Sequence, residues 1–480
     1  MAFKTVCMDA VEMMRRVFFL SMLLWATVAL GQPAGQPLDL LQAHAQALRH
    51  SQQLAASRAH VEGARLRSEG MRGLGGPSLA LGAAGYAYSV HADVGLGPMR
   101  HALGGALQQM PAPLQQGMGP ALPILPETYA LRRREERATV SVSGVWPLYT
   151  GGLAQAVRDG LEASEQEAVA DAALAHAALQ RQVVERYFDA QLAARAAALR
   201  AQAVQAMQKH DEAAQKMQEA GVVAHVERLQ ARSALAEAQQ QAAQARDAEQ
   251  LAQVALQRTI GATQALTLTT PLFLHSQPLP PLAHFIDAAQ RHHPGLEKIQ
   301  AKRQQAQALH AAQQAQRKPT VLAFGSHELA AGKPNWVAGV AVRWTLWDSL
   351  DRDSLSRSAL EKVSEAEHSQ RQALQDIALL VEKHWLDAEH ARTRYLAQQD
   401  QQQLAQELLR LRQAGLRAGA STALDLMDAQ LQLAKVQTER AQSANQYVKA
   451  LAALLESSGQ GEQFPRYQQQ ADIQILPDTP

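Results

Sequence analysis

The chain has 480 residues, and its 46 basic and 45 acidic side chains give a formal net charge of only +1. A charge so evenly balanced provides no general attraction for nucleic acid, so a nucleic-acid partner is not expected. Aromatic residues make up 5% of the chain, and residues 150–260 are mainly Ala, Gln, Leu, Glu and Arg, a composition typical of long helices rather than of a packed α/β core. The single cysteine, Cys7, excludes an internal disulfide and any cysteine-based metal site.

The N-terminal segment has the pattern of a secretory signal peptide. Arg15 and Arg16 precede an apolar run over 17–30, and the small residues at its end predict cleavage before Gln32, so that residues 1–31 form the signal peptide. An apolar run of about 14 residues is shorter than the roughly 20 that a membrane-spanning helix requires, and no later segment is long enough. We therefore expect an exported mature chain without a transmembrane helix.

An internal duplication organises the rest of the chain. Identical residues recur at a constant spacing of 198 positions without a gap, and they include tryptophans and turn glycines that are not general helix-forming residues. The pairs are Trp146/Trp344, Leu148/Leu346, Asp189/Asp387, Ala190/Ala388, Gly221/Gly419, Ala231/Ala429, Leu256/Leu454 and Gly261/Gly459. A second spacing of 242 positions, between Pro77 and Pro319, indicates that the first half carries 44 extra residues at about 91–137. The predicted domains are a first repeat at 32–261, a linker at 262–283, a second repeat at 284–459 and a tail at 460–480.

Each repeat contains a predicted β-hairpin. Residues 140–143 alternate between Val and Ser, with the period of two expected of a half-exposed strand. In the second half, alternate residues from Trp336 to Leu346 form one apolar face that suits contact with lipid. The expected strands are about 77–90 and 138–149, separated by the insertion loop 91–137, and about 320–327 and 336–347.

Long helices are predicted after each hairpin. Thr150 and Asp348, again 198 positions apart, are expected N-cap residues, and Gly221 and Gly419 are expected to end the helices. The predicted helices are 36–70, 152–220 and 224–259 in the first repeat, and 284–317, 349–418 and 422–458 in the second. Four strands cannot close a membrane barrel, because known barrels have at least about eight, so the chain is expected to oligomerise. The residues alone do not choose between two copies and three.

Two turn motifs resemble those of the TolC family of outer-membrane efflux proteins, also called outer-membrane factors. In each repeat a turn glycine, Gly221 or Gly419, is followed six positions later by an acidic residue, Glu227 or Asp425. The resemblance covers nearly all of the expected mature chain. It implies a mostly α fold with a transmembrane β-barrel: four strands per protomer in a trimeric 12-stranded barrel, plus a long periplasmic α-helical barrel. It also implies that the linker and the tail form an equatorial region.

The resemblance further implies an exit duct in the outer membrane with a periplasmic helical extension. Such a channel works with a periplasmic adaptor (membrane fusion) protein and an inner-membrane transporter, in tripartite efflux or type I secretion. The channel performs no chemistry, so neither enzyme activity nor a cofactor is expected, and the usual P-loop, zinc-protease and hydrolase motifs do not occur in the sequence. The implied partners are further copies of the chain in a homotrimer, the adaptor, the transporter and outer-membrane lipid.

The resemblance places Asp425 and Asp428 at the periplasmic pore entrance, where three copies provide six carboxylates that attract cations. Thr422 and Asp425 also match a helix capping box, which accounts for that acid without any pore. Ser421 stands where the family has a basic residue that helps to hold the entrance closed. The neighbouring Glu227 and Arg228 offer a substitute ion pair at the entrance, although such charges are also typical of a solvated surface.

The adaptor is expected to dock on the two turns, which comprise Gly221, Val222, Val223, Gly419, Ala420 and Ser421. A plain helix-hairpin turn also explains both glycines. No metal site is predicted, because the 17 histidines do not have the spacing of a ligand set. A soluble periplasmic coiled-coil adaptor or scaffold is the alternative function, since it shares the export signal and the Ala/Gln-rich helices. The two hairpins with tryptophan-bearing apolar faces favour the channel.

Overall fold

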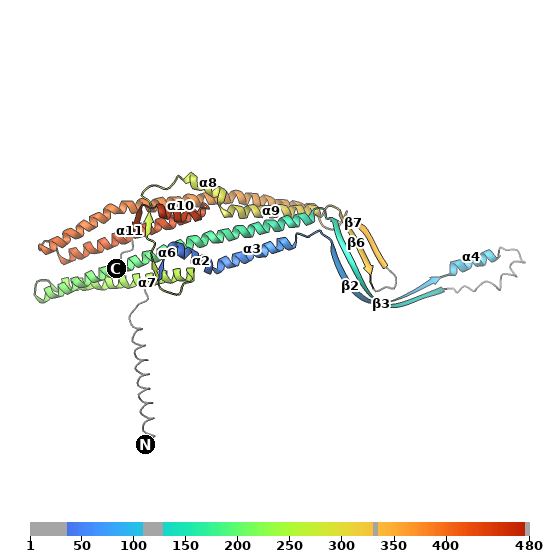
Figure 1. Cartoon of the computed structure of the whole chain (residues 1–480), viewed down its shortest axis with the longest axis horizontal. Coiled ribbons are helices and arrows are strands. Elements are labelled where there is room, and N and C mark those ends of the chain that lie inside the picture. The colour runs from blue at the N-terminus through green and yellow to red at the C-terminus, as the bar shows by residue number, and fades with distance from the viewer. Residues whose placement is uncertain (1–35, 109–127, 330–334, 476–480) are drawn as a thin grey trace, which may run out of the picture. The chain divides into compact units, whose positions relative to one another are not determined.

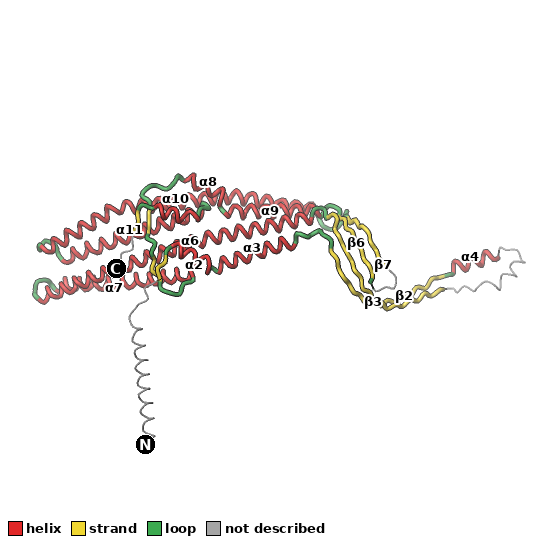
Figure 2. Tube along the Cα trace, viewed as in Figure 1, coloured by secondary structure: helices red, strands yellow, loops and turns green. Residues whose placement is uncertain are grey.

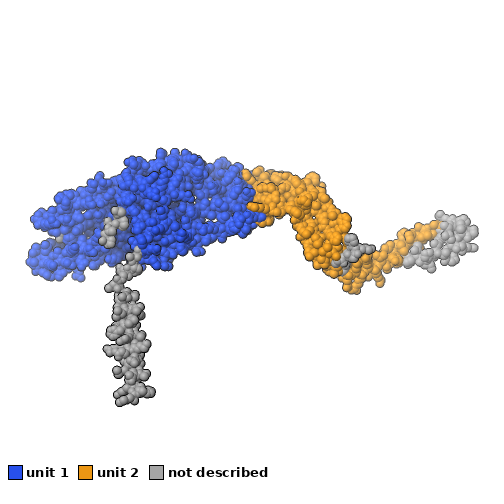
Figure 3. All heavy atoms as spheres, in the orientation of Figure 1, with its two compact units in different colours: residues 1–69, 161–306, 361–480 blue, residues 70–160, 307–360 orange. Residues whose placement is uncertain are grey.

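The computed structural model describes residues 36–108, 128–329 and 335–475. The predicted signal peptide, 1–31, lies outside these residues. The chain divides into two units, coloured separately in Figure 3: residues 1–69, 161–306 and 361–480 form the first, and residues 70–160 and 307–360 form the second. Within the described residues, no helix is both long enough and apolar enough to cross a lipid bilayer.

Long helices dominate the first unit (Figures 1 and 2). The two longest are α6 (Leu153–Glu219) and α10 (Arg352–Arg417), of 67 and 66 residues, and each continues into the second unit. At 1.5 Å per residue each is on the order of 100 Å long. Each returns as a helix of about half that length, α7 (His225–Ile260) or α11 (Ala423–Ser457).

Two predicted helices are each broken in two. The segment 36–70 begins with a short strand, β1 (Gln36–Leu38), and continues as α2 (Leu40–His50) and α3 (Gln52–Gly70). Asp39 caps α2 with a complete capping box, which fixes its start four residues later than predicted. The segment 284–317 is α8 (Leu282–His292) and α9 (Pro294–Ala315), divided because proline disfavours a helical conformation in the residue before it.

Short strands and aromatic side chains form the core of the first unit. Strand β1 pairs in parallel with β4 (Leu266–Leu268), and β5 (Leu272–Leu274) pairs antiparallel with β8 (Ile473–Ile475). Fully buried rings meet edge to face at centroid distances of 5.3 to 6.0 Å, and they are Tyr187, Phe188, Phe273 and Phe464. The Tyr187 hydroxyl donates to the Leu38 carbonyl at 2.8 Å, so the core joins α6 to β1.

The linker and the tail complete this core. The linker supplies β4 and β5, while the tail supplies a short 3-10 turn (Gly461–Gln463), α12 (Phe464–Gln470) and β8. Strand β5 packs against α11, so linker and tail cover one face of the return helix. This arrangement accounts for the prolines that separate the two repeats, because the linker turns repeatedly across the helices instead of continuing one of them.

The second unit contains a four-stranded antiparallel sheet, shown as yellow strands in Figure 2. Its strands are β2 (Ser78–Gly95), β3 (Thr128–Tyr149), β6 (Thr320–Glu328) and β7 (Asn335–Arg343), in that order across the sheet. Within this sheet, each strand pairs with the sheet strand that follows it along the chain. The central β3–β6 pair joins the hairpins of the two halves. In the described part of the chain, β2 and β7 are each paired on one side only.

The first hairpin is longer than predicted. Strands β2 and β3 remain paired from Ser78↔Val145 to Gly95↔Thr128, and α4 (Gly97–Gln108) follows β2, so much of the expected loop 91–137 has regular structure. The charged run before residue 138 gave no strand signal, because arginine and glutamate carry little β preference. Backbone pairing overrides that preference, and Tyr88 supports it by donating to Glu135 across the ladder at 2.6 Å.

Neither predicted N-cap residue occupies the N-cap position, because α6 begins at Leu153 and α10 begins at Arg352. The Thr150 hydroxyl accepts a hydrogen bond from the Ala154 amide at 3.3 Å, near the start of α6. Helix α10 begins at Arg352 and is capped by Asp351. The Asp351 carboxylate accepts hydrogen bonds from the backbone amides of Asp353 and Ser354, at 3.1 and 3.0 Å. Asp348 instead forms an ion pair with Arg352 at 2.5 Å. The predicted strand 336–347 ends at Arg343, so residues 344–351 lead into this later start.

Candidate functional site

The two helical hairpins end in turns of the same construction, both at the left of Figure 1. In the first turn, the Val222 and Gly221 amides donate to the Met217 and Gln218 carbonyls at 2.8 and 2.9 Å. The second turn repeats this pattern 198 positions later, at 2.7 and 3.2 Å. Both glycines have positive φ, +73° and +74°, with open space around them, so the backbone conformation and not crowding requires glycine. All six residues predicted at the turns lie in them.

The first turn is the more apolar of the two. Val222 is 69% exposed, and Val226 and Leu229 on the first turns of α7 are also exposed. Val226 and Leu229, spaced by three, share one face of α7 and extend the apolar surface from the turn onto that helix. In the second turn, Ala420 and Ser421 occupy the places of Val222 and Val223, so the two turns differ in surface chemistry.

Asp425 acts as a helix cap. Its backbone amide donates to the Thr422 hydroxyl at 3.1 Å, and its carboxylate accepts from the Thr422 amide and hydroxyl at 2.9 and 2.8 Å. These bonds, together with Arg412 at 3.9 Å, hold the pKa of the Asp425 carboxyl below its usual value. The capping box predicted from the sequence is therefore confirmed. Asp428 lies one turn further on and is exposed to solvent.

Arg228 binds within its own hairpin. It forms an ion pair with Asp211 on α6 and also donates to Gln215 at 3.4 Å, and the Arg228 and Asp211 side chains are only 17% and 15% exposed. Glu227 is exposed in the first turn of α7. Within this chain the Arg228 guanidinium therefore pairs with Asp211 on α6. Asp211 was not singled out from the sequence, since its pairing depends on how the hairpin helices align.

The two hairpins contact each other a short way from the turns. His210 on α6 and Gln430 on α11 are joined by a hydrogen bond of 3.2 Å. Met207, Ala238 and Met427 form a small buried cluster beside this bond, with one residue each from α6, α7 and α11. Sequence reasoning missed this contact. The available signal was the three-residue spacing shared by 207/210 and 427/430, which places each pair on one helix face.

A charged groove of about 480 Å³ lies between α6, α10 and α11. Its ionisable side chains are Arg181, Glu185, Lys383, His384, Asp387, His390, Arg394 and Lys449. Burial, followed by the charge of Lys383, lowers the pKa of His384. Within the residues that the structure describes, no group of three or more His, Cys, Asp or Glu side chains is arranged to hold a metal ion.

Several solved structures share the fold of this chain. The chain is similar to a membrane protein from Pseudomonas aeruginosa, at 17% identity and TM-score 0.72, over 88% of this chain and 90% of that chain. It is also similar to the open state of the MtrE outer membrane channel from Neisseria gonorrhoeae, at 18% identity and TM-score 0.70, over 88% and 89% of the two chains. The outer membrane protein VceC from Vibrio cholerae matches at 16% identity and TM-score 0.67, over 88% and 96%. At these identities the likeness shows the fold.

No curated protein matches the sequence. The model of one family, described as outer membrane efflux protein, matches the chain twice, over residues 43–262 and 285–460. The two matches follow the two halves of the duplication, and each includes a long helix, its return helix and a β-hairpin. Together they cover most of the sequence. The chain therefore belongs to the outer membrane efflux protein family.

Proposed function

We propose that three copies of this chain form one exit duct, which receives its cargo from a periplasmic adaptor and an inner-membrane transporter. Family membership and fold make the chain an outer-membrane efflux channel with a periplasmic helical part, and they do not favour a soluble adaptor. The proposal adds the number of copies, the partners and the entrance. It rests on the four-stranded sheet formed by β2, β3, β6 and β7.

The sheet supports closure by copies of itself. One face of β7 carries exposed apolar side chains, with Trp336, Val340 and Val342 exposed by 70%, 63% and 68%. Unpaired strand edges in lipid are costly, because each unsatisfied backbone group costs several kcal/mol there. Pairing β7 of one copy with β2 of the next satisfies both edges. Eight strands from two copies is near the lower limit for a barrel, whereas twelve from three leave room for a lumen.

The entrance is proposed at the ends of the helical hairpins. Asp428 is exposed, and Asp425 keeps its negative charge while it caps α11. Three copies bring six carboxylates to this level, and a ring of carboxylates in a narrow water-filled opening attracts cations. Glu227 adds an exposed acid on the neighbouring hairpin, and Arg228 beside it is proposed to lie at the entrance while it pairs with Asp211.

The turns are proposed to be the adaptor-docking surface. The first turn presents Val222, Val226 and Leu229 as an exposed apolar stripe, which suits a helical partner with its own apolar tip. The second turn, Gly419, Ala420 and Ser421, is small and polar, so it permits close backbone approach. Gly221 and Val223 complete the set of residues proposed for docking.

Single-channel recording in planar bilayers tests the entrance. Purified protein is expected to form discrete, cation-selective channels, and the double variant Asp425→Ala/Asp428→Ala is expected to lose most of that selectivity. The matched control is Asp376→Ala, which removes an exposed carboxylate from α10 far from the turn. Cation selectivity that survives the double substitution unchanged removes these acids from the entrance.

A further inference from the structure

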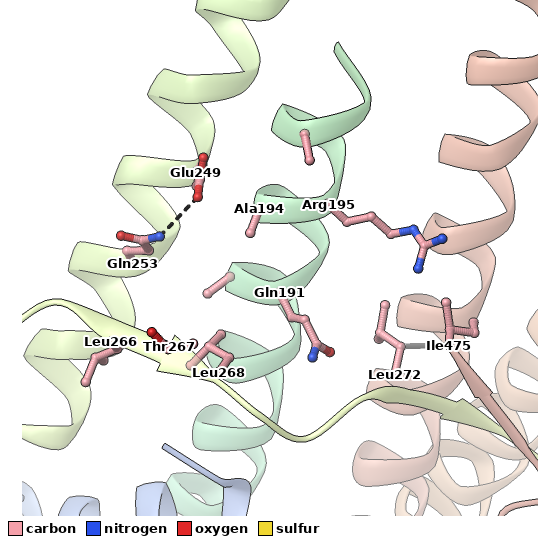
Figure 4. A pocket seen from close by; sticks show the side chains of 12 residues that line it. Gln191, Ala194, Arg195, Glu249, Gln253, Leu266, Thr267, Leu268, Leu272 and Ile475 are labelled. Atoms are coloured by element: carbon pink, nitrogen blue, oxygen red, sulfur yellow. Dashed lines mark hydrogen bonds between the residues drawn. The ribbon is translucent and has the colours of Figure 1, made fainter. Parts of the chain in front are cut away.

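A cavity of about 250 Å³ lies in the first unit, beside the core strands (Figure 4). One wall is apolar and consists of Leu266, Leu268, Leu272 and Ile475. Another comes from the facing helices, with small alanines of α6 on one side and Glu249 and Gln253 of α7 on the other. In Figure 4 the Gln253 amide donates to Glu249, at 3.2 Å. The remaining lining residues are Ala190, Gln191, Ala194, Arg195, Ala198 and Thr267.

A buried hydrogen-bond acceptor lines this cavity. The Gln191 side chain is only 6% exposed, and its Nε2 donates to the Thr270 carbonyl at 2.5 Å. That bond fixes the amide, whose Oε1 is buried and has no hydrogen-bond partner among the described residues. A buried acceptor without a partner destabilises the folded chain, so a donor supplied from within the cavity is favoured.

The duplication provides an internal comparison, because residues 198 positions later occupy the equivalent place in the second half. There Glu249 and Gln253 are replaced by Tyr447 and Leu451, which are both fully buried. The Tyr447 hydroxyl is hydrogen-bonded to His275 at 2.8 Å, within the aromatic core.

The other cavity positions are also filled in the second half. Ala198 is replaced by Leu396, which packs against the core. Gln191 and Ala194 are replaced by Glu389 and Arg392, which form an ion pair at 2.8 Å with side chains about 15% exposed. The second half therefore closes its version of the site with side chains, whereas the first half leaves it hollow and lined by an open acceptor.

We propose that the cavity of the first half binds a small neutral aromatic molecule with one hydrogen-bond donor, of the size of indole or phenol. Its volume suits one or two rings, since an apolar cavity of about 150 Å³ accommodates benzene. The leucine and isoleucine wall matches the rings, and Gln191 Oε1 accepts from the donor. A single water, with a share of about 30 Å³, satisfies the acceptor but leaves most of the apolar wall uncovered.

The charges at the rim favour a neutral ligand. Glu249 and Arg195 both line the cavity. The Glu249 carboxylate repels an anionic ligand, and the Arg195 guanidinium repels a cationic one. Burial raises the pKa of the Glu249 carboxyl. In Figure 4 the Arg195 side chain extends away from Glu249 and Gln253.

The test compares indole with 1-methylindole by calorimetric titration of the purified full-length oligomer. Both have the same rings, but only indole has the N–H donor. We expect saturable binding of indole at one site per chain and about tenfold weaker binding of 1-methylindole, because the methyl compound leaves Gln191 Oε1 unsatisfied. Absence of saturable indole binding, or equal affinity for both compounds, overturns the proposal.

Three variants locate the site. Ala198→Leu introduces the residue found in the second half and is expected to abolish binding of both compounds. The heat that remains with this variant measures uptake of the compounds by detergent. Gln191→Leu is expected to erase the preference for indole. Gln398→Leu is the matched control, because Gln398 is also 6% exposed with a buried Oε1 that lacks a partner among the described residues, but it does not line the cavity. Binding that survives Ala198→Leu in a protein with unchanged thermal stability contradicts the assignment of the cavity as the binding site. This outcome is independent of whether the protein forms channels.

Discussion

At the scale of single residues, Asp425 and Asp428 show how one motif serves two purposes. The carboxylate of Asp425 is bound to Thr422, while Asp428 is exposed one helical turn away. The cap was predictable because a capping box is local, with both partners within four residues. The Arg228 partner, Asp211, was not predictable, because the two lie on different helices and their contact depends on how the hairpin closes.

The Arg228 ion pair is expected to stabilise the first hairpin. Substitution of Arg228 by Met keeps the apolar stem but leaves the Asp211 carboxylate half-enclosed without its partner. Breaking such a pair costs roughly 3 kcal/mol, so amide exchange near the first turn is expected to accelerate on the order of 100-fold, measured by hydrogen–deuterium exchange. Arg412→Met is the control, since its contact with Asp425 is 3.9 Å long and about 40% exposed, and it is expected to change exchange little. Equal effects of the two substitutions contradict this role.

His44 is expected to make stability depend on pH. Burial, followed by the charge of His176, lowers the pKa of His44 to about 4 in the folded chain, against about 6.5 when unfolded. The unfolded state therefore binds the proton more readily, so stability present above about pH 6.5 is lost as the pH falls toward 4. Between pH 7 and pH 5 the loss attributable to His44 is about 2 kcal/mol. Urea unfolding of the His44→Gln variant is expected to show a correspondingly weaker pH dependence, and an unchanged dependence contradicts the assignment.

At the scale of elements, the long helices and both turns were predictable, whereas the strands were less so. Regular helical composition and paired glycines located α6, α7, α10 and α11 to within a few residues. Strand β3 was predicted to begin ten residues too late, at 138 instead of 128, because cross-strand partners and not local residue preferences hold its first half. The later start of α10 depends on a choice between two nearby aspartates.

The contact between His210 and Gln430 is expected to restrain the two hairpins. Since the only cysteine in the sequence is Cys7, in the predicted signal peptide, the double variant His210→Cys/Gln430→Cys offers one pair of thiols for a short dimaleimide cross-linker that contains a reducible disulfide. Cross-linking is expected to join α6 to α11 and to lower single-channel conductance, with recovery after the linker is reduced. Full conductance in the cross-linked protein, with the cross-link verified by mass spectrometry, shows that the hairpins do not separate during opening.

The apolar face of β7 is expected to contact lipid. Val340→Arg places a charge on this face, at a cost of about 2–4 kcal/mol if the position lies near the bilayer midplane. The variant is expected to yield less oligomer in outer-membrane fractions, as judged by gel mobility without heating. Ala341→Arg is the control, because neighbouring strand residues point to opposite faces, and it is expected to assemble normally. The reverse pattern indicates that the two faces have been assigned the wrong way round.

At the scale of the whole molecule, the duplication determined most of the fold that could be predicted. A constant spacing of 198 residues related the hairpins and helices of the two halves, and the predicted fold class, family and outer-membrane efflux role are confirmed. The cavity between α6, α7 and three short strands was not foreseen, because its lining residues come from five elements. The first half is hollow at this place, whereas larger side chains fill the equivalent positions of the second half.

The channel assignment is tested most directly by fractionating cells that express the full chain and examining the protein on gels with and without heating. We predict recovery in the outer membrane, extraction only by detergent, and an oligomer of three copies that dissociates on heating. Recovery as a soluble monomer without detergent would contradict the assignment.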